Sequence, residues 1–185
     1  LLSSLKGRTL VEALHKSIIF TLFGTGIRVG ELINLKRKDF GKLRGMKVIR
    51  FKAKGGKYRM LPLKDEISRE IENYLFLMSK EGRLHSLDDP LFQPSRNRHT
   101  NALVKPLNKT TIFRLLKKHC QNVDIFDRVS PHSARATMIS SLLEKGVDLY
   151  KVSIAAGHSN PKTTKLYDKR DKKIEDSALL EVGYF

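Results

Sequence analysis

Apolar residues recur at helical spacing along most of the chain. In residues 10–23, LVEALHKSIIFTLF, they return every three or four positions, which is typical of an amphipathic helix. The sequence GTG ends that helix, and residues 27–36 predict a second one with Ile27, Leu32 and Leu35 facing inward. Residues 64–80 predict a third helix, because acidic residues lie in its first turn, where the helix dipole favours negative charge.

The pattern changes from helical spacing to alternation in residues 47–63. The alternating positions are Val48, Phe51, Tyr58, Met60 and Leu63. This alternation predicts two antiparallel strands joined by a turn over residues 54–57, KGGK. We expect Tyr58 to pack within its strand and Tyr74 to pack within the third helix.

Helical spacing returns after a proline-rich loop. Residues 82–109 hold three of the six prolines and show little periodicity, so we expect a long loop there. Thr110 is expected to cap a helix over residues 110–123. Ser130 is expected to cap the next helix, in which Pro131 takes the first position.

Two shorter helical segments and an apolar tail complete the chain. Residues 147–157 predict a helix that stops at Gly157, and NPKTTKLYD begins another. The C-terminal tail, about residues 171–185, is too apolar for a free tail. The pattern predicts an α+β fold that is mainly α, with a small antiparallel β-sheet or hairpin, in a single domain of residues 1–185.

The net charge narrows the class of partner. The formal net charge is +17, and it is uneven along the chain. Residues 1–64 carry 16 Lys and Arg residues against 3 acids, whereas residues 65–185 carry 20 against 16. This asymmetry favours a polyanionic partner such as DNA, although ribosomal and membrane-surface proteins can be equally basic.

Composition excludes several other classes. Hydrophobic residues make up 40% of the chain, which is enough for a packed core and argues against disorder. Cys120 is the only cysteine, so no internal disulfide forms, and a reducing compartment is expected. No apolar run has the length of a membrane span, and no signal peptide is visible. Because the chain begins with Leu1, we expect it to be part of a longer protein.

Four residues suited to phosphate chemistry are concentrated near the end of the chain, at His132, Arg135, His158 and Tyr167. His132 and Arg135 lie three apart on one predicted helix and therefore share a face. Taken singly, each of the four is ordinary, either a surface or capping residue or a half-buried aromatic. Two earlier positions are equally ordinary alone, since Arg28 with Glu31 indicates an intrahelical ion pair and Lys54 a solvated turn residue.

As a set, these residues suit the transfer of a phosphoryl group. Arginines offer paired donors to the non-bridging oxygens of a phosphodiester, and a histidine adds another. A tyrosine oxygen can form a covalent phosphate ester that a hydroxyl later displaces. A lysine or histidine can protonate the leaving oxygen. Such a site needs no metal and no other cofactor, and the sequence shows no carboxylate cluster typical of a two-metal nuclease.

Four segments in this order, TGIRVGEL, AKGGKYRMLPL, SPHSARA and AGHSNPKTTKLYD, resemble the catalytic domain of the tyrosine recombinases, the phage integrase family. The resemblance runs from about residue 10 to the tail. It implies a metal-free, site-specific recombinase or integrase that cleaves and rejoins DNA through a 3′-phosphotyrosyl intermediate.

The resemblance also implies a role for each site residue. Arg28 and Arg135 would clamp the scissile phosphate, with His158 as a third donor. Lys54 would be the general acid and Tyr167 the nucleophile. His132 would assist proton transfer at the tyrosine, and Glu31 would support the first arginine. The basic residues expected to contact DNA are Lys52, Lys57, Arg59, Lys162 and Lys165.

Partners and location follow from the same resemblance. We expect double-stranded DNA as the partner, with self-association on DNA, as a tetramer, through the C-terminal tail. A core-binding domain is expected to precede this chain in the whole protein. The expected setting is the cytoplasm of a bacterium or archaeon, near the nucleoid, with a phage as another source of the gene.

Three alternatives stay open. A type IB topoisomerase uses similar residues, and relaxation of supercoiled DNA without a specific site would favour it. A non-catalytic DNA-binding module could keep the fold, but such a copy usually loses a catalytic position, and none is lost here. An RNA-binding protein is the weakest alternative, because no pattern of stacking aromatic residues is visible.

Overall fold

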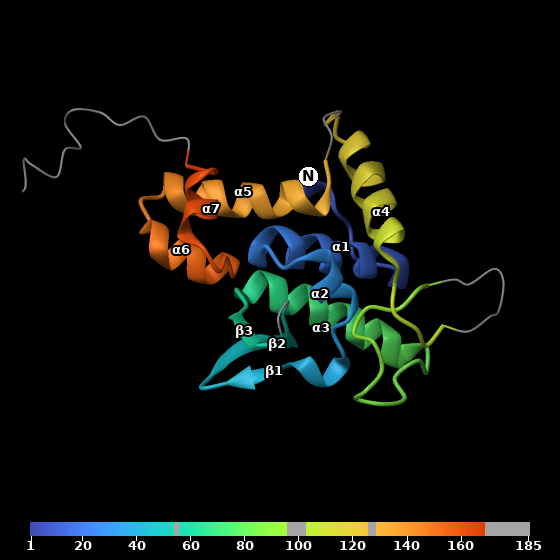
Figure 1. Ribbon diagram of the computed structural model, residues 1–185. Coiled ribbons are helices and arrows are strands. Elements are labelled where there is room, and N and C mark those ends of the chain that lie inside the picture. Colours follow the sequence, from blue (N-terminus) through green and yellow to red (C-terminus); the bar gives the residue numbers. More distant parts are fainter. Residues whose placement is uncertain (54–55, 96–102, 126–128, 169–185) are drawn as a thin grey trace, which may run out of the picture. The chain divides into compact units, whose positions relative to one another are not determined.

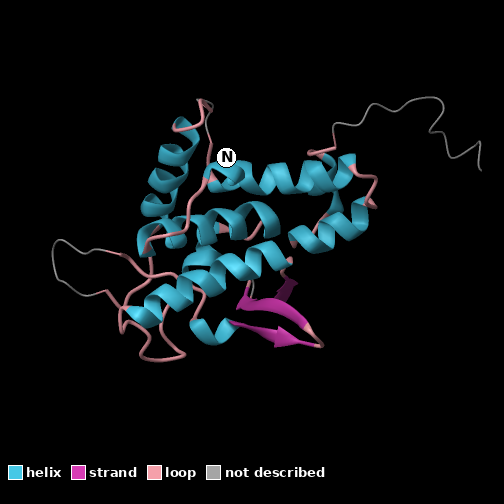
Figure 2. Cartoon of the chain, turned by 180° about the vertical axis from the view of Figure 1, so that it is seen from behind, coloured by secondary structure: helices cyan, strands magenta, loops and turns pink. Residues whose placement is uncertain are grey.

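The computed structural model describes residues 1–53, 56–95, 103–125 and 129–168. Its chain forms two compact units, residues 1–138 and residues 139–185. Helices dominate the described residues, with a three-stranded antiparallel sheet in the first unit (Figure 2). The mainly α fold class with a small antiparallel sheet is therefore confirmed.

Two long helices form the centre of the first unit. Helix α1 (Leu10–Thr25) and helix α3 (Asp65–Lys80) lie side by side (Figure 1), and Lys16 pairs with Glu70 across them at 2.9 Å. Gly24 lets the two approach closely, because a Cβ there would lie 2.3 Å from the Cδ1 of Ile67. Thr9 caps α1 in a capping box with Glu12.

The second helix is shorter than its sequence pattern predicts. Helix α2 covers only Val29–Ile33, and a 3₁₀ turn follows at Arg37–Asp39. The predicted inward positions Ile27, Leu32 and Leu35 are nevertheless each only 1% exposed. Leu35 lies beyond the end of α2. Its carbonyl accepts a hydrogen bond from the backbone N–H of Leu91 at 2.7 Å instead of a bond within the helix.

The sheet has one strand more than the alternating pattern predicts. Its strands β1 (Phe40–Leu43), β2 (Met46–Lys52) and β3 (Tyr58–Pro62) pair in the order β1-β2-β3. The inner face packs Ile49, Phe51 and Leu61 into the same core as α3. The prediction that Tyr58 packs within its strand is wrong. Leu61 pairs with Ile49 and faces the core, and Tyr58 lies an odd number of positions from Leu61, so it faces away from the core and is 75% exposed.

The predicted packing of Tyr74 is confirmed. Tyr74 is fully buried in α3, and its hydroxyl accepts from the backbone N–H of Gln93 at 3.2 Å. Between α3 and helix α4 (Lys109–Gln121), the described residues form no further helix or strand, and residues 96–102 of the predicted loop lie outside the described part. Asn108 rather than Thr110 caps that helix, since its Oδ1 accepts from the Thr111 N–H at 2.7 Å.

Helix α5 (Pro131–Glu144) begins as predicted, with the hydroxyl of Ser130 accepting from the Ser133 N–H at 3.1 Å. In the second unit, helix α6 (Leu149–Ala156) ends at Gly157, which adopts a left-handed conformation with φ 69°. Asn160 caps the short helix α7 (Pro161–Lys165). Residues 171–185, the predicted apolar tail, lie outside the described residues.

Candidate functional site

Arg28 is positioned by the break between α1 and α2. Gly26 ends α1 with φ 61°, so the chain turns sharply and Arg28 becomes the residue that precedes α2. Glu31 lies one turn later and is only 8% exposed. One of its carboxylate oxygens accepts from the Arg28 backbone N–H at 3.0 Å, and the other contacts Nη1 of Arg28 at 3.2 Å. Glu31 therefore holds both the backbone and the guanidinium of Arg28.

Arg135 is tied to the same break. Its Nη1 donates to the carbonyl oxygen of Gly26 over 2.6 Å, and its side chain is 5% exposed. A Cβ on residue 26 would lie 2.2 Å from the Cε of Met138 and 3.6 Å from the Cγ of Arg135. The left-handed turn thus favours a glycine, and any side chain at this position would also displace the flexible end of Met138. Two arginines 107 positions apart in the sequence are anchored to one three-residue segment.

A third arginine lies within electrostatic range of the first. Arg59 extends from β3 and lies over the ring of Phe51, with 5.8 Å from its guanidinium carbon to the ring centroid. Burial lowers the pKa of Arg59, Glu31 raises it, and the positive charge of Arg28 lowers it. The first unit therefore concentrates guanidinium groups around the Glu31 carboxylate, an arrangement that can bind an anion such as a phosphate.

His132 lies at the start of α5, one turn before Arg135, and it is exposed. Lys52 and Lys57 are exposed near the β2–β3 turn, where the Ala53 N–H donates to the Lys57 carbonyl at 2.8 Å. Lys54, the predicted general acid, lies outside the described residues.

The second unit brings His158 and Tyr167 together. Their rings stack with centroids 6.1 Å apart and planes 15° from parallel. The Nδ1 of His158 contacts the hydroxyl of Thr164 at 2.8 Å, and Thr164 is fully buried. The backbone N–H of Tyr167 donates to the Thr164 carbonyl at 3.0 Å. Thr164 thus orients the histidine ring and fixes the backbone that carries the tyrosine.

The backbone of Tyr167 has a second support. The hydroxyl of Ser140, on α5 within the second unit, donates to the Tyr167 carbonyl at 3.2 Å. Lys162 and Lys165 are exposed on α7, just before the tyrosine. Both lysines add positive charge to the helix that precedes the tyrosine.

Sequence reasoning missed the supporting residues Gly26, Thr164 and Ser140. The sequence GTG predicts a helix break, but nothing in the sequence indicates that the Gly26 carbonyl accepts from Arg135. Thr164 lies in TTKLY three positions before Tyr167, a spacing that places the two residues on one face of a helix. Ser140 lies 27 positions from Tyr167, and no local pattern connects the two.

Metal and membrane features are limited in the described part of the chain. No group of three or more His, Cys, Asp or Glu side chains there is arranged to hold a metal ion. Over the same residues, no helix is both long enough and apolar enough to cross a membrane.

The fold is mainly helical with a small antiparallel sheet, and its candidate residues are arginines held at a glycine break and a histidine stacked on a tyrosine. A family model described as the phage integrase family matches residues 6–173. The chain belongs to the phage integrase family, as the four motifs indicate.

Curated relatives are similar over most of this chain. Tyrosine recombinase XerA of Pyrococcus furiosus is 32% identical over 186 residues, covering 94% of this chain and 60% of the relative. Tyrosine recombinase XerD of Shewanella oneidensis is 30% identical over 157 residues, covering 85% of this chain and 49% of the relative. The chain therefore spans about half to three-fifths of the length of these relatives.

Solved structures show the same fold. The crystal structure of XerA recombinase aligns with a TM-score of 0.71 at 29% identity, covering 95% of this chain and 60% of that one. XerH site-specific recombinase, bound to palindromic difH substrate in a post-cleavage complex, aligns with a TM-score of 0.76 at 24% identity, covering 98% and 50%. Both confirm the predicted fold.

Proposed function

We propose that this chain is the catalytic part of a site-specific tyrosine recombinase, which cleaves and rejoins double-stranded DNA. The observation that carries the proposal is the anchoring of Arg135 to Gly26, two residues before Arg28, in a chain of the phage integrase family. Arginines fixed in this way suit one anionic phosphate better than a flexible lysine would, because a guanidinium offers two parallel donors.

The proposed reaction begins at Tyr167. Its Oη attacks the scissile phosphorus, an Oη–P bond forms, and the P–O5′ bond breaks. The phenol proton passes to His132, and Lys54 donates a proton to the leaving 5′ oxygen. Arg28, Arg135 and His158 stabilise the charge on the non-bridging oxygens. Rejoining reverses these steps, with a 5′ hydroxyl from the partner strand as the attacking group. Because these cations neutralise the charge, the proposal requires no metal.

Three contacts support the placement of these groups. Glu31 and the Gly26 carbonyl hold the two arginines within the first unit. Thr164 holds His158 beside Tyr167 within the second. Structures of similar fold include the Tn1549 transposon integrase in complex with circular intermediate DNA.

The wider setting is part of the proposal. We propose that a DNA-binding domain N-terminal to this region in the whole protein completes a clamp around the duplex. The tail of residues 171–185 would link subunits of a tetramer on DNA. Such a reaction would take place in the cytoplasm, at the nucleoid.

The test is covalent trapping on a nicked duplex that carries the native site, from which the cleaved fragment diffuses away. A DNA adduct that survives detergent is expected on Tyr167, mapped by mass spectrometry, with cleavage unimpaired in EDTA. Tyr167→Phe should abolish the adduct and leave DNA affinity nearly unchanged. Tyr150→Phe, at a tyrosine that is 62% exposed, is the matched control and should leave the adduct intact. An adduct that persists in Tyr167→Phe would overturn the proposal.

A further inference from the structure

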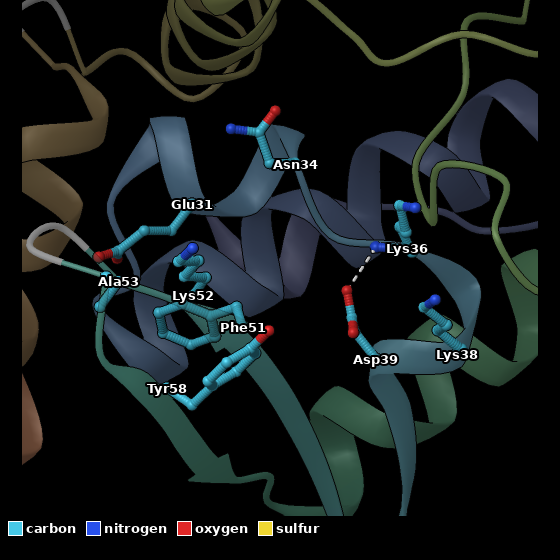
Figure 3. Close-up of a pocket in the computed structure, with 10 residues that line it drawn as sticks. Glu31, Asn34, Lys36, Lys38, Asp39, Phe51, Lys52, Ala53 and Tyr58 are labelled. Atoms are coloured by element: carbon cyan, nitrogen blue, oxygen red, sulfur yellow. Dashed lines mark hydrogen bonds between the residues drawn. The ribbon is translucent and has the colours of Figure 1, made fainter.

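A polar pocket of about 490 Å³ lies between α2 and the sheet of the first unit. Lys36 and Lys38 line one side of it, and Glu31 and Lys52 lie on the other (Figure 3). The two carboxylates in the lining are already engaged. Glu31 holds Arg28, and Asp39 accepts from the Lys36 backbone N–H at 2.8 Å. Both acids of the lining are therefore held by groups of the protein itself, and the remaining charged side chains of the lining are the lysines Lys36, Lys38 and Lys52.

Lys36 and Lys38 converge on one point outside the pocket lining. Both ammonium groups contact the same carboxylate oxygen, Oδ1 of Asp88, at 2.9 and 2.5 Å. The hydrogen bond from Lys38 and then that from Lys36 lower the pKa of Asp88 to about 2, and the bond to Asp88 raises the pKa of Lys38. Two ammonium groups that meet on one anionic oxygen can equally bind a non-bridging oxygen of a phosphate.

The backbone on both sides of this cluster is fixed by hydrogen bonds. The Arg37 N–H donates to the Asp89 carbonyl and the Lys38 N–H donates to the Leu87 carbonyl, each at 2.9 Å. The two lysines are therefore presented by a preorganised segment rather than by a free loop, so they lose less conformational freedom on binding a ligand.

All three side chains remain open to solvent. Lys36, Lys38 and Asp88 have exposed fractions of 47%, 50% and 61%. An ion pair this exposed contributes little to stability. Exchange of the Asp88 carboxylate for a phosphate oxygen therefore costs the fold little, while the phosphate gains two charge-assisted hydrogen bonds.

We propose that Lys36 and Lys38 form a seat for a non-scissile phosphate of the DNA backbone, and that Asp88 occupies this seat when DNA is absent. The inference rests on the proposed function only in taking DNA as the partner. Glu31, which holds Arg28, lines the same pocket as Lys36 and Lys38, so the seat lies in the first unit together with the arginine proposed to bind the scissile phosphate. Asp88 then acts as a built-in competitor that weakens binding to DNA of any sequence.

The test is fluorescence anisotropy with a labelled 30-base-pair duplex titrated at several KCl concentrations. Log affinity falls as log salt rises. The double variant Lys36→Gln with Lys38→Gln should make this fall less steep by about 1 unit of slope, the contribution of one phosphate. Asp88→Asn should raise affinity without changing that slope, because the seat is then unoccupied.

Glu72→Gln is the matched control for Asp88→Asn. Glu72 is another exposed acid, it pairs with Lys47 on β2, and its substitution changes the net charge by the same amount. The DNA affinity of Asp88→Asn should be about three times that of Glu72→Gln. Equal effects of the two variants, or an unchanged slope in the lysine double variant, would overturn the inference.

The trapping assay separates this inference from the proposed function. If the adduct forms on Tyr167 but Asp88→Asn behaves like Glu72→Gln, the phosphate seat is wrong and the recombinase proposal stands. If no adduct forms but the lysine double variant still loses one unit of slope, the seat stands and the recombinase proposal fails.

Discussion

The guanidinium of Arg135 is bonded through Nη1 to the main-chain carbonyl of Gly26 over 2.6 Å. This contact joins the first turns of α5 to the end of α1, two residues before Arg28. The position of one arginine in the candidate site therefore depends on the backbone conformation that precedes the other.

Gly26→Ala is expected to destabilise the protein more than Gly45→Ala. Both glycines have positive φ, 61° and 86°, so both substitutions add backbone strain. Only residue 26 also has a neighbour in the way, because its Cβ would lie 2.2 Å from the Cε of Met138, whereas no atom lies within 4 Å at residue 45. The additional cost should be about 1 kcal/mol, measured by urea unfolding.

Met138→Ala in the Gly26→Ala background tests the steric part of this prediction. Removal of the Met138 side chain should make the cost of Gly26→Ala equal to that of Gly45→Ala. If the difference between the two glycine substitutions persisted in that background, the clash with Met138 would not be its cause.

Glu31→Gln is expected to reduce adduct formation by about tenfold or more, since the buried partner of Arg28 loses its charge and the guanidinium loses a charge-assisted hydrogen bond. DNA affinity should change much less. Glu12→Gln is the matched control, because Glu12 accepts from the backbone N–H groups of Arg8 and Thr9 at the start of α1. A similar loss of adduct in both variants would show that Glu31 acts through stability alone.

Thr164→Val is expected to slow adduct formation while leaving DNA affinity unchanged. The substitution keeps the volume of a fully buried side chain but removes the hydroxyl that contacts Nδ1 of His158 at 2.8 Å. Thr164→Ser retains the hydroxyl and should restore the rate. The measurement is single-turnover trapping together with thermal unfolding, and equal rates in the Val and Ser variants would exclude a positioning role.

Stability should fall as the pH falls from about 6.5 toward 4. The Nδ1 of His15 on α1 lies 3.0 Å from the Nε2 of His119 on α4, so one of the two rings must accept the hydrogen bond. Burial, followed by the charge of His119, lowers the pKa of His15 from 6.5 to about 4. In this window the unfolded chain binds a proton that the folded chain does not, which favours unfolding.

His15→Gln removes one of two titrating rings, because burial also lowers the pKa of His119. The thermal midpoint of this variant should therefore fall less than that of the wild type between pH 7 and pH 4.5. His85→Gln, at an exposed histidine in the loop after α3, is the control and should follow the wild type. The prediction is wrong if both variants show the same pH dependence.

The sequence predicted the long helices well because their apolar spacing repeats over several turns. It missed strand β1, where Phe40 and Leu43 are three apart and do not alternate, and where the turn to β2 uses Arg44 at φ 48°. It also misplaced Tyr58, since which face a strand buries depends on its register with a neighbouring strand. The motif residues were recognisable as a set from the family resemblance.

What the sequence could not predict are contacts between distant segments. His15 and His119 are 104 positions apart, and Asp88 reaches Lys36 from a loop without periodicity. These pairs depend on how helices and loops pack in three dimensions. The same is true of the contact between Arg135 and Gly26, although both residues lie in recognised motifs.

The acceptor for Arg135 is an atom that every amino acid possesses. An alanine scan, which removes side chains one at a time, cannot delete the Gly26 carbonyl and would report only the strain of the new methyl group. Replacing the amide between Gly26 and Ile27 with an ester by chemical ligation would weaken that carbonyl as an acceptor and leave every side chain in place. It would also remove the Ile27 N–H, which donates to Oγ1 of Thr25 at 3.2 Å, so Thr25→Val is the control for that lost bond. Library-based engineering of this protein would therefore leave unchanged an anchor that side-chain diversity never samples.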